Sequence, residues 1–177
     1  NLKYPALAIE RAKMLPNHSI FYTSAHLAIT ESRKEASTPH NQSAYHIFIQ
    51  TRHIWTQMIS NFRMYLANRL GSFDESVLPV QEQDVAIQHQ GLQRLLNRLQ
   101  KQDDAGELEF RGSISLADLK MAANDWFSAF QQIKRIHTTD EWRTDTMLQR
   151  TTIKPSMDLV WNILLELDKS IETSANY

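Results

Sequence analysis

Glycine and proline are scarce in this chain, and they separate long segments in which apolar residues recur every three or four positions. Only four glycines and five prolines occur in 177 residues, too few for the many tight turns of an all-β protein. The residues that divide the periodic segments are Pro16, Pro39, Gly71, Pro79, Gly106, Gly112 and Pro155. Because apolar spacing of three and four is typical of amphipathic helices, the pattern predicts an all-α fold.

The spacing predicts a small set of long helices joined by short connections. The predicted helices cover 17–36, 41–70, 82–102, 115–137 and 155–173. The main irregular stretch, residues 103–114, is predicted to be a loop. We therefore predict a single-domain, up-and-down bundle of four to five helices over residues 1–177, with one irregular loop near 103–114.

Within the predicted helices, the spacing also indicates which side chains face the core. These residues are Phe21, Leu27 and Ala28 in the first helix, Phe48, Trp55, Ile59, Phe62 and Leu66 in the second, and Val85, Leu92, Leu95, Leu96 and Leu99 in the third. Ser115 and Asp118 resemble a capping box at the start of the fourth helix. The last helix is predicted to be the most buried, because apolar residues cover more than half of its circumference.

The composition excludes several classes of chemistry. The chain has no cysteine, which excludes a disulfide framework, a thiol nucleophile and cysteine-based metal sites. No apolar run approaches the roughly 18 residues of a membrane span, so a soluble protein without membrane contact is expected. The chain begins with Asn1 rather than Met, so a removed signal segment would leave no trace in it. Cytoplasm is the default expectation for its location.

The stretch 40–55, "HNQSAYHIFIQTRHIW", looks most like a site because it holds His40, His46 and His53. On a helix, His46 and His53 fall opposite the core residues Phe48 and Trp55. Seven residues of helix rise about 10.5 Å, too far for two histidines to bind one zinc with bonds of about 2 Å. The sequence therefore predicts a solvated helix face, with no metal and no cofactor.

No motif in the chain selects a catalytic residue. There is no G-x-S-x-G, no P-loop and no G-x-G-x-x-G, so the sequence favours a non-catalytic protein without deciding the question. His137 and Trp126 share the core face of the fourth helix, and they are the weak candidates for a pocket. The competing interpretation is that His137 is a core-edge histidine, or a cation stabilised at a helix C-terminus.

Two basic rows suggest a nucleic-acid surface as an alternative. Tyr45, Arg52 and Arg63 fall in one row of the second helix, and such rows can follow a phosphate backbone. Another row consists of Arg94, Arg98 and Lys101. The net charge of −1 is unlike that of dedicated nucleic-acid binders, which are strongly basic. Trp142 lies off the core stripe of a continued fourth helix, which suggests either an anchor for a protein partner or a contact to the loop.

These observations predict an interaction or scaffolding domain without catalytic activity, acting as a subunit of a homo-oligomer or larger assembly. Candidate partner-binding residues are Tyr45, Arg52, Arg63 and Trp142. The alternatives are a nucleic-acid-associated accessory subunit that uses the basic rows, and a ligand-binding bundle or enzyme with a pocket near Trp126 and His137.

Overall fold

The computed structural model describes residues 4–34, 39–71, 75–139 and 152–175. Helices cover almost all of these residues, and no strand occurs among them. The chain forms two compact units, one of residues 12–129 and the other of residues 1–11 and 130–177. The predicted all-α fold is therefore confirmed, and each unit is described by itself.

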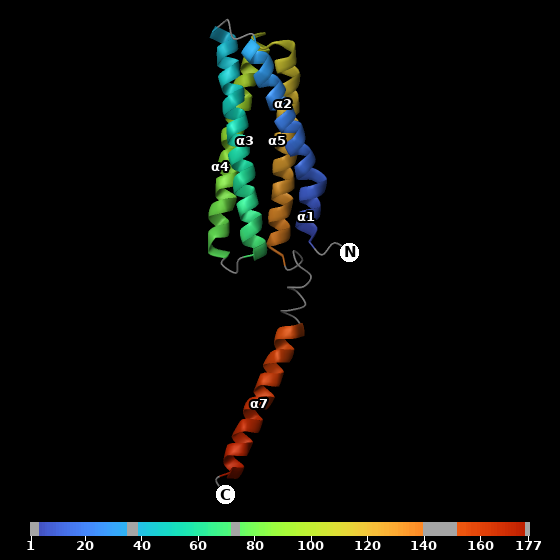
Figure 1. The fold of residues 1–177 in the computed structure, drawn as a ribbon, viewed down its shortest axis with the longest axis vertical. Coiled ribbons are helices and arrows are strands. Elements are labelled where there is room, and N and C mark those ends of the chain that lie inside the picture. The colour runs from blue at the N-terminus through green and yellow to red at the C-terminus, as the bar shows by residue number, and fades with distance from the viewer. Residues whose placement is uncertain (1–3, 35–38, 72–74, 140–151, 176–177) are drawn as a thin grey trace. The chain divides into compact units, whose positions relative to one another are not determined.

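The larger unit is a bundle of antiparallel helices (Figure 1). It contains α2 (Leu15–Lys34), α3 (Pro39–Gly71), α4 (Leu78–Asp104) and most of α5 (Phe110–His137). A short 3₁₀ turn, Glu75–Val77, leads into α4. Consecutive helices run in opposite directions, and α3 packs against both α2 and α4. This is the up-and-down arrangement that the sequence predicts.

The helix that includes α2 begins earlier than predicted. Helical chain runs without a break from α1 (Pro5–Ile9), through a π-helical turn at Glu10–Met14, into α2. The predicted start after Pro16 is wrong. A proline inside an α-helix lacks an N–H group and its ring crowds the carbonyl four residues back, but a π turn just before it rearranges that hydrogen-bond ladder. The side-chain amide of Asn17 also donates to the Lys13 carbonyl at 2.8 Å.

The loop between α4 and α5 is shorter than the predicted 103–114, because it covers only residues 105–109. Gly106 has a φ of +70° and its N–H bonds to the Asp103 carbonyl, while the Glu107 N–H bonds to the Gln102 carbonyl. These two bonds form the Schellman motif that ends many helices at a glycine. The sharp helix end explains why so few residues are needed to reverse the chain.

The predicted capping box is wrong, because α5 already begins at Phe110. Ser115 and Asp118 therefore lie inside the helix rather than at its start. Ser115 is buried, and the Asp118 carboxylate accepts a hydrogen bond of 3.2 Å from the Ser24 hydroxyl of α2. Asp118 thus connects two helices of the bundle instead of capping one of them.

Replacing Gly106 by alanine is expected to lower the free energy of unfolding by about 1 kcal/mol, because a side chain at this φ strains the backbone. A Cβ there meets no atom within 4 Å, so no collision adds to the effect. The matched control is Gly91→Ala inside α4, where the nearest atom, Ile54 Cδ1, is 3.6 Å away. This control should gain about 0.5–1 kcal/mol in urea unfolding. Equal signs for the two variants would contradict the prediction.

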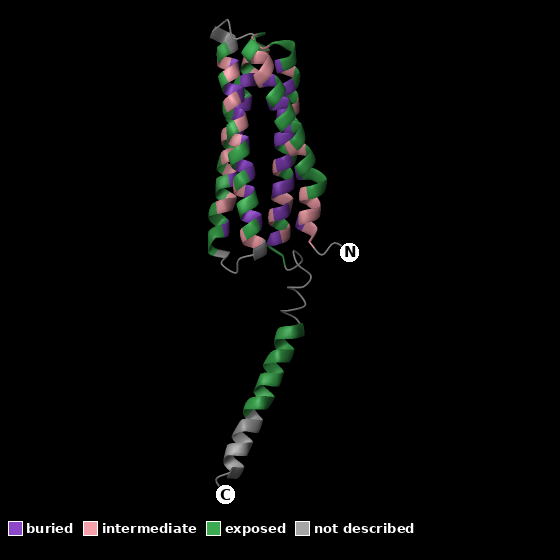
Figure 2. Cartoon of the chain, viewed as in Figure 1, coloured by how far each residue is buried: buried purple, intermediate pink, exposed green. Residues whose placement is uncertain are grey.

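Buried residues recur along each helix of the bundle (Figure 2), and aromatic residues from three helices pack against one another among them. The Trp55 ring of α3 stacks on Phe21 of α2 with centroids 3.9 Å apart. Trp126 of α5 meets the Trp55 ring at 5.6 Å and the Phe62 ring at 5.2 Å, edge to face in both cases. Such edge-to-face pairs are a favoured aromatic geometry. The core residues predicted in α3 and α4 are all buried.

The predicted inward face of α2 is only partly correct. Phe21 and Ala28 are buried, but Leu27 is 48% exposed. The buried face of this helix consists of Phe21 together with the small residues Ser24, Ala25 and Ala28. Apolar character alone does not separate Leu27 from these positions, so the prediction placed the larger residue inward.

The other unit contains α7 (Lys154–Ala175), which begins within one residue of the predicted start at Pro155. The prediction that this helix is the most buried is wrong. Every side chain from residue 152 to residue 165 is exposed (Figure 2). A wide apolar face indicates that a helix requires a partner surface, but its spacing does not reveal whether the same chain supplies that surface.

Candidate functional site

His46 and His53 of α3 lie on the solvated side of the helix, as predicted. His46 and His53 are exposed, whereas Phe48 and Trp55 are fully buried. The side chain of His40 lies outside the described residues. Within the described ranges, no three histidine or carboxylate side chains are grouped so that they could hold a metal ion.

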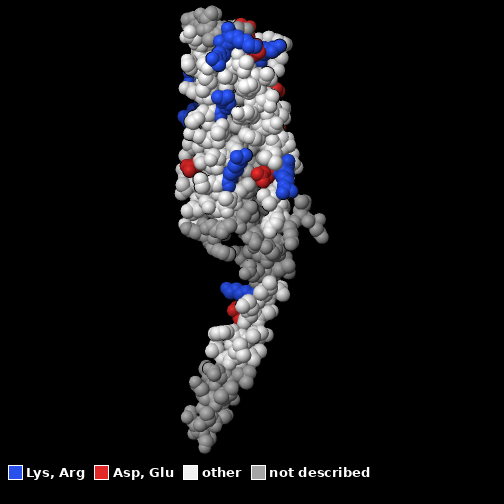
Figure 3. All heavy atoms as spheres, in the orientation of Figure 1, with Lys and Arg blue, Asp and Glu red and all other residues white. Residues whose placement is uncertain are grey.

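The row of Tyr45, Arg52 and Arg63 follows α3 without converging on a point. Tyr45 and Arg52 are half-buried and Arg63 is exposed. Their spacings of seven and eleven residues correspond to roughly 10 Å and 16 Å along the axis. On the face drawn in Figure 3, Lys and Arg side chains gather beside acidic ones at one end of the bundle and are scattered over uncharged surface elsewhere. The basic residues of this row are therefore widely spaced along the helix and do not form a concentrated basic patch.

The two pocket candidates are both buried. Trp126 is 1% exposed and lies edge-on to two aromatic rings, so its own ring presents no open face to a ligand. His137 is also buried, at the end of α5. Trp142, the predicted partner anchor, lies outside the described residues.

His18 is a site residue that the sequence did not single out. The Trp55 Nε1–H donates a hydrogen bond of 2.9 Å to His18 Nδ1, and the two rings are parallel to within 10°. Burial, reinforced by the Arg63 charge, lowers the pKa of His18. The neutral ring is the form that can accept this bond. His18 therefore satisfies the only polar atom of a buried tryptophan.

A second histidine, His89 of α4, contacts α5 through its ring. The His89 ring stacks on Phe127 with centroids 3.7 Å apart. The Gln93 amide lies 3.2 Å from His89 Nε2 and donates to Asn124 at 2.9 Å. Burial lowers the pKa of His89. Like His18, this histidine is held in the neutral form by its surroundings.

The bundle should lose stability as the pH falls below the ordinary histidine pKa of 6.5. The folded pKa values of His18 and His89 are lowered, so the unfolded chain binds more protons in this range. The contribution of these two neutral histidines to the free energy of unfolding is complete above pH 6.5. It is lost as the pH falls through their pKa values in the folded chain. Urea unfolding from about pH 8 to about pH 5 measures the effect.

A double variant, His18→Gln with His89→Gln, should show a flatter pH profile than the unchanged chain. The control is His53→Gln, because His53 is exposed on the outer side of α3 and should leave the profile as it was. A profile that is equally steep in the double variant would contradict the assignment to His18 and His89.

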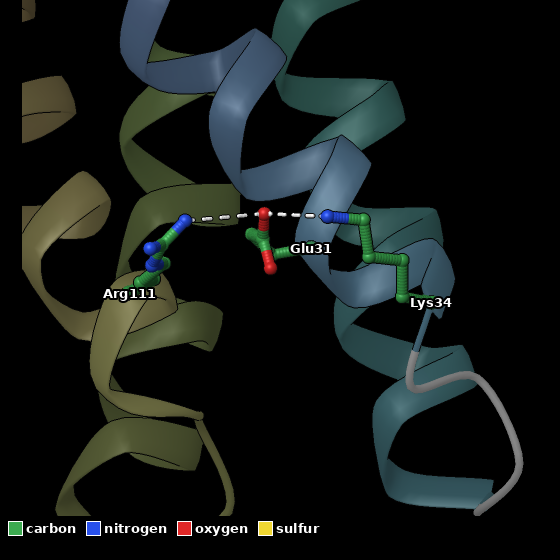
Figure 4. Close-up of polar contacts among 3 residues, drawn as sticks. All are labelled: Glu31, Lys34 and Arg111. Carbon is green, nitrogen blue, oxygen red and sulfur yellow. Dashed lines mark hydrogen bonds and ion pairs between the residues drawn. The ribbon is translucent and has the colours of Figure 1, made fainter.

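An ion cluster lies on the surface where α2 meets α5 (Figure 4). Glu31 Oε1 pairs with Lys34 at 3.0 Å and with Arg111 at 3.3 Å. The hydrogen bond from Lys34, with the charges of Lys34 and Arg111, lowers the pKa of Glu31. Exposed pairs of this kind contribute little to stability. The adjacent hollow at Ala44 and Leu108 measures about 10 Å³, room for a single water at most.

The densest run of exposed large apolar side chains among the described residues lies in α7 and just before it. Ile153 lies directly before the helix, and Met157, Val160 and Leu164 follow it at intervals of four, three and four residues. Residues at this spacing lie on one side of a helix, and we call these four the α7 seam. Their exposed fractions are 50%, 66%, 56% and 53%. Trp161, next to the seam, is 65% exposed.

A shallow hollow runs along this side of α7. It is lined by Thr152, Ile153, Ser156, Met157, Val160 and Trp161. Because all of its lining comes from one short stretch of chain, it is an open surface rather than an enclosed ligand pocket. A surface of this kind can receive side chains from another helix.

In comparisons with known proteins, no family, no curated protein and no solved structure matches the chain. No helix over the described residues has both the length and the apolar character needed to cross a membrane. The site must therefore be interpreted from its own chemistry.

Proposed function

We propose that this protein is a non-catalytic interaction subunit that binds a protein partner through α7. The observation that supports the proposal is the exposure of the α7 seam and of Trp161. Contiguous apolar patches of this kind mark interaction sites on soluble proteins. Tryptophan and methionine, both present here, are enriched at protein interfaces.

The charge of α7 favours a protein partner over a lipid surface. Residues 154–175 contain two lysines, Lys154 and Lys169, against the carboxylates of Asp158, Glu166, Asp168 and Glu172. Helices that lie on membranes are usually rich in Lys and Arg on their polar face, whereas this one is net acidic. We include in this proposal the cytoplasmic location that is the default expectation from the sequence.

The two alternative functions receive less support from the geometry. The nucleic-acid alternative relies on Arg52 and Arg63, which are separated by more than 16 Å along α3 by helix rise and do not form a concentrated patch. The pocket alternative relies on Trp126, whose ring is packed against other aromatic rings. Neither alternative has an exposed surface comparable to α7.

Site-specific photocross-linking in cells that produce the protein tests the proposal. Benzoylphenylalanine would replace Trp161 in one variant and His53, which is also exposed, in a control variant. We expect covalent protein adducts from position 161 and none from position 53. Adducts from neither position, or equal adducts from both, would overturn the proposal.

A further inference from the structure

We propose that the partner of α7 is the α7 helix of a second copy of this chain, packed against it in the antiparallel direction. This inference rests on the proposed function and names its partner. The α7 seam has spacings of four, three and four residues. In the sequence, Leu167 follows the last seam residue by three positions, and Ile171 follows Leu167 by four. An apolar repeat that alternates four and three is the pattern by which helices pack on other helices with the same pattern.

A second copy in the antiparallel direction fills every position of the seam. The apolar positions then pair as Ile153 with Ile171, Met157 with Leu167, and Val160 with Leu164, and each pair occurs twice about a two-fold axis. A two-fold axis requires a self-complementary surface, and this repeat is self-complementary along its whole length. No partner of different sequence is needed to bury it.

Charge and side-chain shape favour the antiparallel direction over the parallel one. In the antiparallel pair, Lys154 of one helix lies beside the sequence position of Asp168 in the other, so opposite charges meet at both ends. A parallel pair brings no such charges together. In addition, Ile153 and Val160 occupy the positions where parallel two-stranded coils favour leucine.

The mass of the purified full chain in solution tests the second copy. Sedimentation equilibrium over a wide concentration range should show an average mass that approaches twice the 20.6 kDa of one chain. Leu164→Asp, within the seam, should abolish the dimer. Leu159→Asp is the matched control, because Leu159 is similarly exposed at 62% but lies about 140° around the helix from the seam residue Leu164, and this variant should remain dimeric.

Engineered disulfides test the direction, because the chain has no cysteine of its own. Met157→Cys alone should not cross-link under mild oxidation, since the two copies of that position lie far apart in an antiparallel pair. A mixture of Met157→Cys and Leu167→Cys should give a covalent dimer. Cross-linking of Met157→Cys alone would overturn the antiparallel arrangement.

The two proposals can fail separately. A chain that remains a monomer at all concentrations, or a dimer that survives Leu164→Asp, overturns the pairing with a second copy. If adducts in cells still form from position 161 but with the mass of a different protein, the proposed function survives and only its self-pairing form is wrong. If no adducts form from position 161, the proposed function itself is wrong.

Discussion

Replacing Trp126 by alanine is expected to lower the free energy of unfolding of this bundle by about 3–5 kcal/mol. The side chain is 1% exposed, and its ring contacts Trp55 and Phe62 edge to face. The variant loses the burial of a large ring and leaves a cavity between α3 and α5. Because whole domains are stable by only about 5–15 kcal/mol, the variant should approach the limit of folding. Urea unfolding followed by circular dichroism measures the change.

The control for this variant is Met121→Ala, on the same helix. Met121 is 50% exposed, and its truncation should change the stability by about 0.5 kcal/mol or less. A loss below about 1 kcal/mol for Trp126→Ala would contradict the packed aromatic core. It would also revive the alternative in which Trp126 borders a pocket, because a residue at an open cavity gives up fewer contacts.

The sequence predicts the buried positions of α3, α4 and α5 well, for a physical reason. A long helix that packs on several neighbours keeps one side buried for many turns, so its apolar residues repeat without interruption. Phe48, Trp55 and Ile59 show this repeat in α3, and all three are buried. Trp126 and His137 were placed correctly on the buried face of α5 by the same repeat.

The features that the sequence misses depend on contacts between helices rather than on repeats within one. The bond between Trp55 and His18 joins residues 37 positions apart, and no spacing within α2 predicts it. A signal was present, since His18 precedes the core residue Phe21 by three positions and so shares its side of a helix. The prediction that the helix begins only after Pro16 hid that relation, because it placed His18 at the very start of the helix.

The exposure of α7 illustrates a different limit of the sequence. The repeat of Met157, Val160 and Leu164 predicts a helix that must bury one side, and the structure contains that helix. Periodicity specifies the surface but not the molecule that covers it. The side chains of the seam are exposed, although the spacing predicts that this helix buries one side.

Replacing Ala28 by leucine should destabilise the bundle by about 1–3 kcal/mol, although the change adds apolar surface. Ala28 is fully buried and lies on α2 between two contacts to α5. The Ser24 hydroxyl bonds to Asp118 one turn earlier, and Glu31 pairs with Arg111 one turn later. Because Ala28 is fully buried, a larger side chain there must displace the residues packed around it.

The neighbouring residue provides the matched comparison. Leu27→Ala removes a large apolar side chain, but Leu27 is 48% exposed, so its loss should cost about 0.5 kcal/mol or less. A helix that buried Leu27 would give the opposite ranking, with a loss of about 2–5 kcal/mol for Leu27→Ala and little effect of a larger residue at position 28. Urea unfolding of the two variants therefore decides which side of α2 faces the core, because the two orientations predict opposite orders of stability.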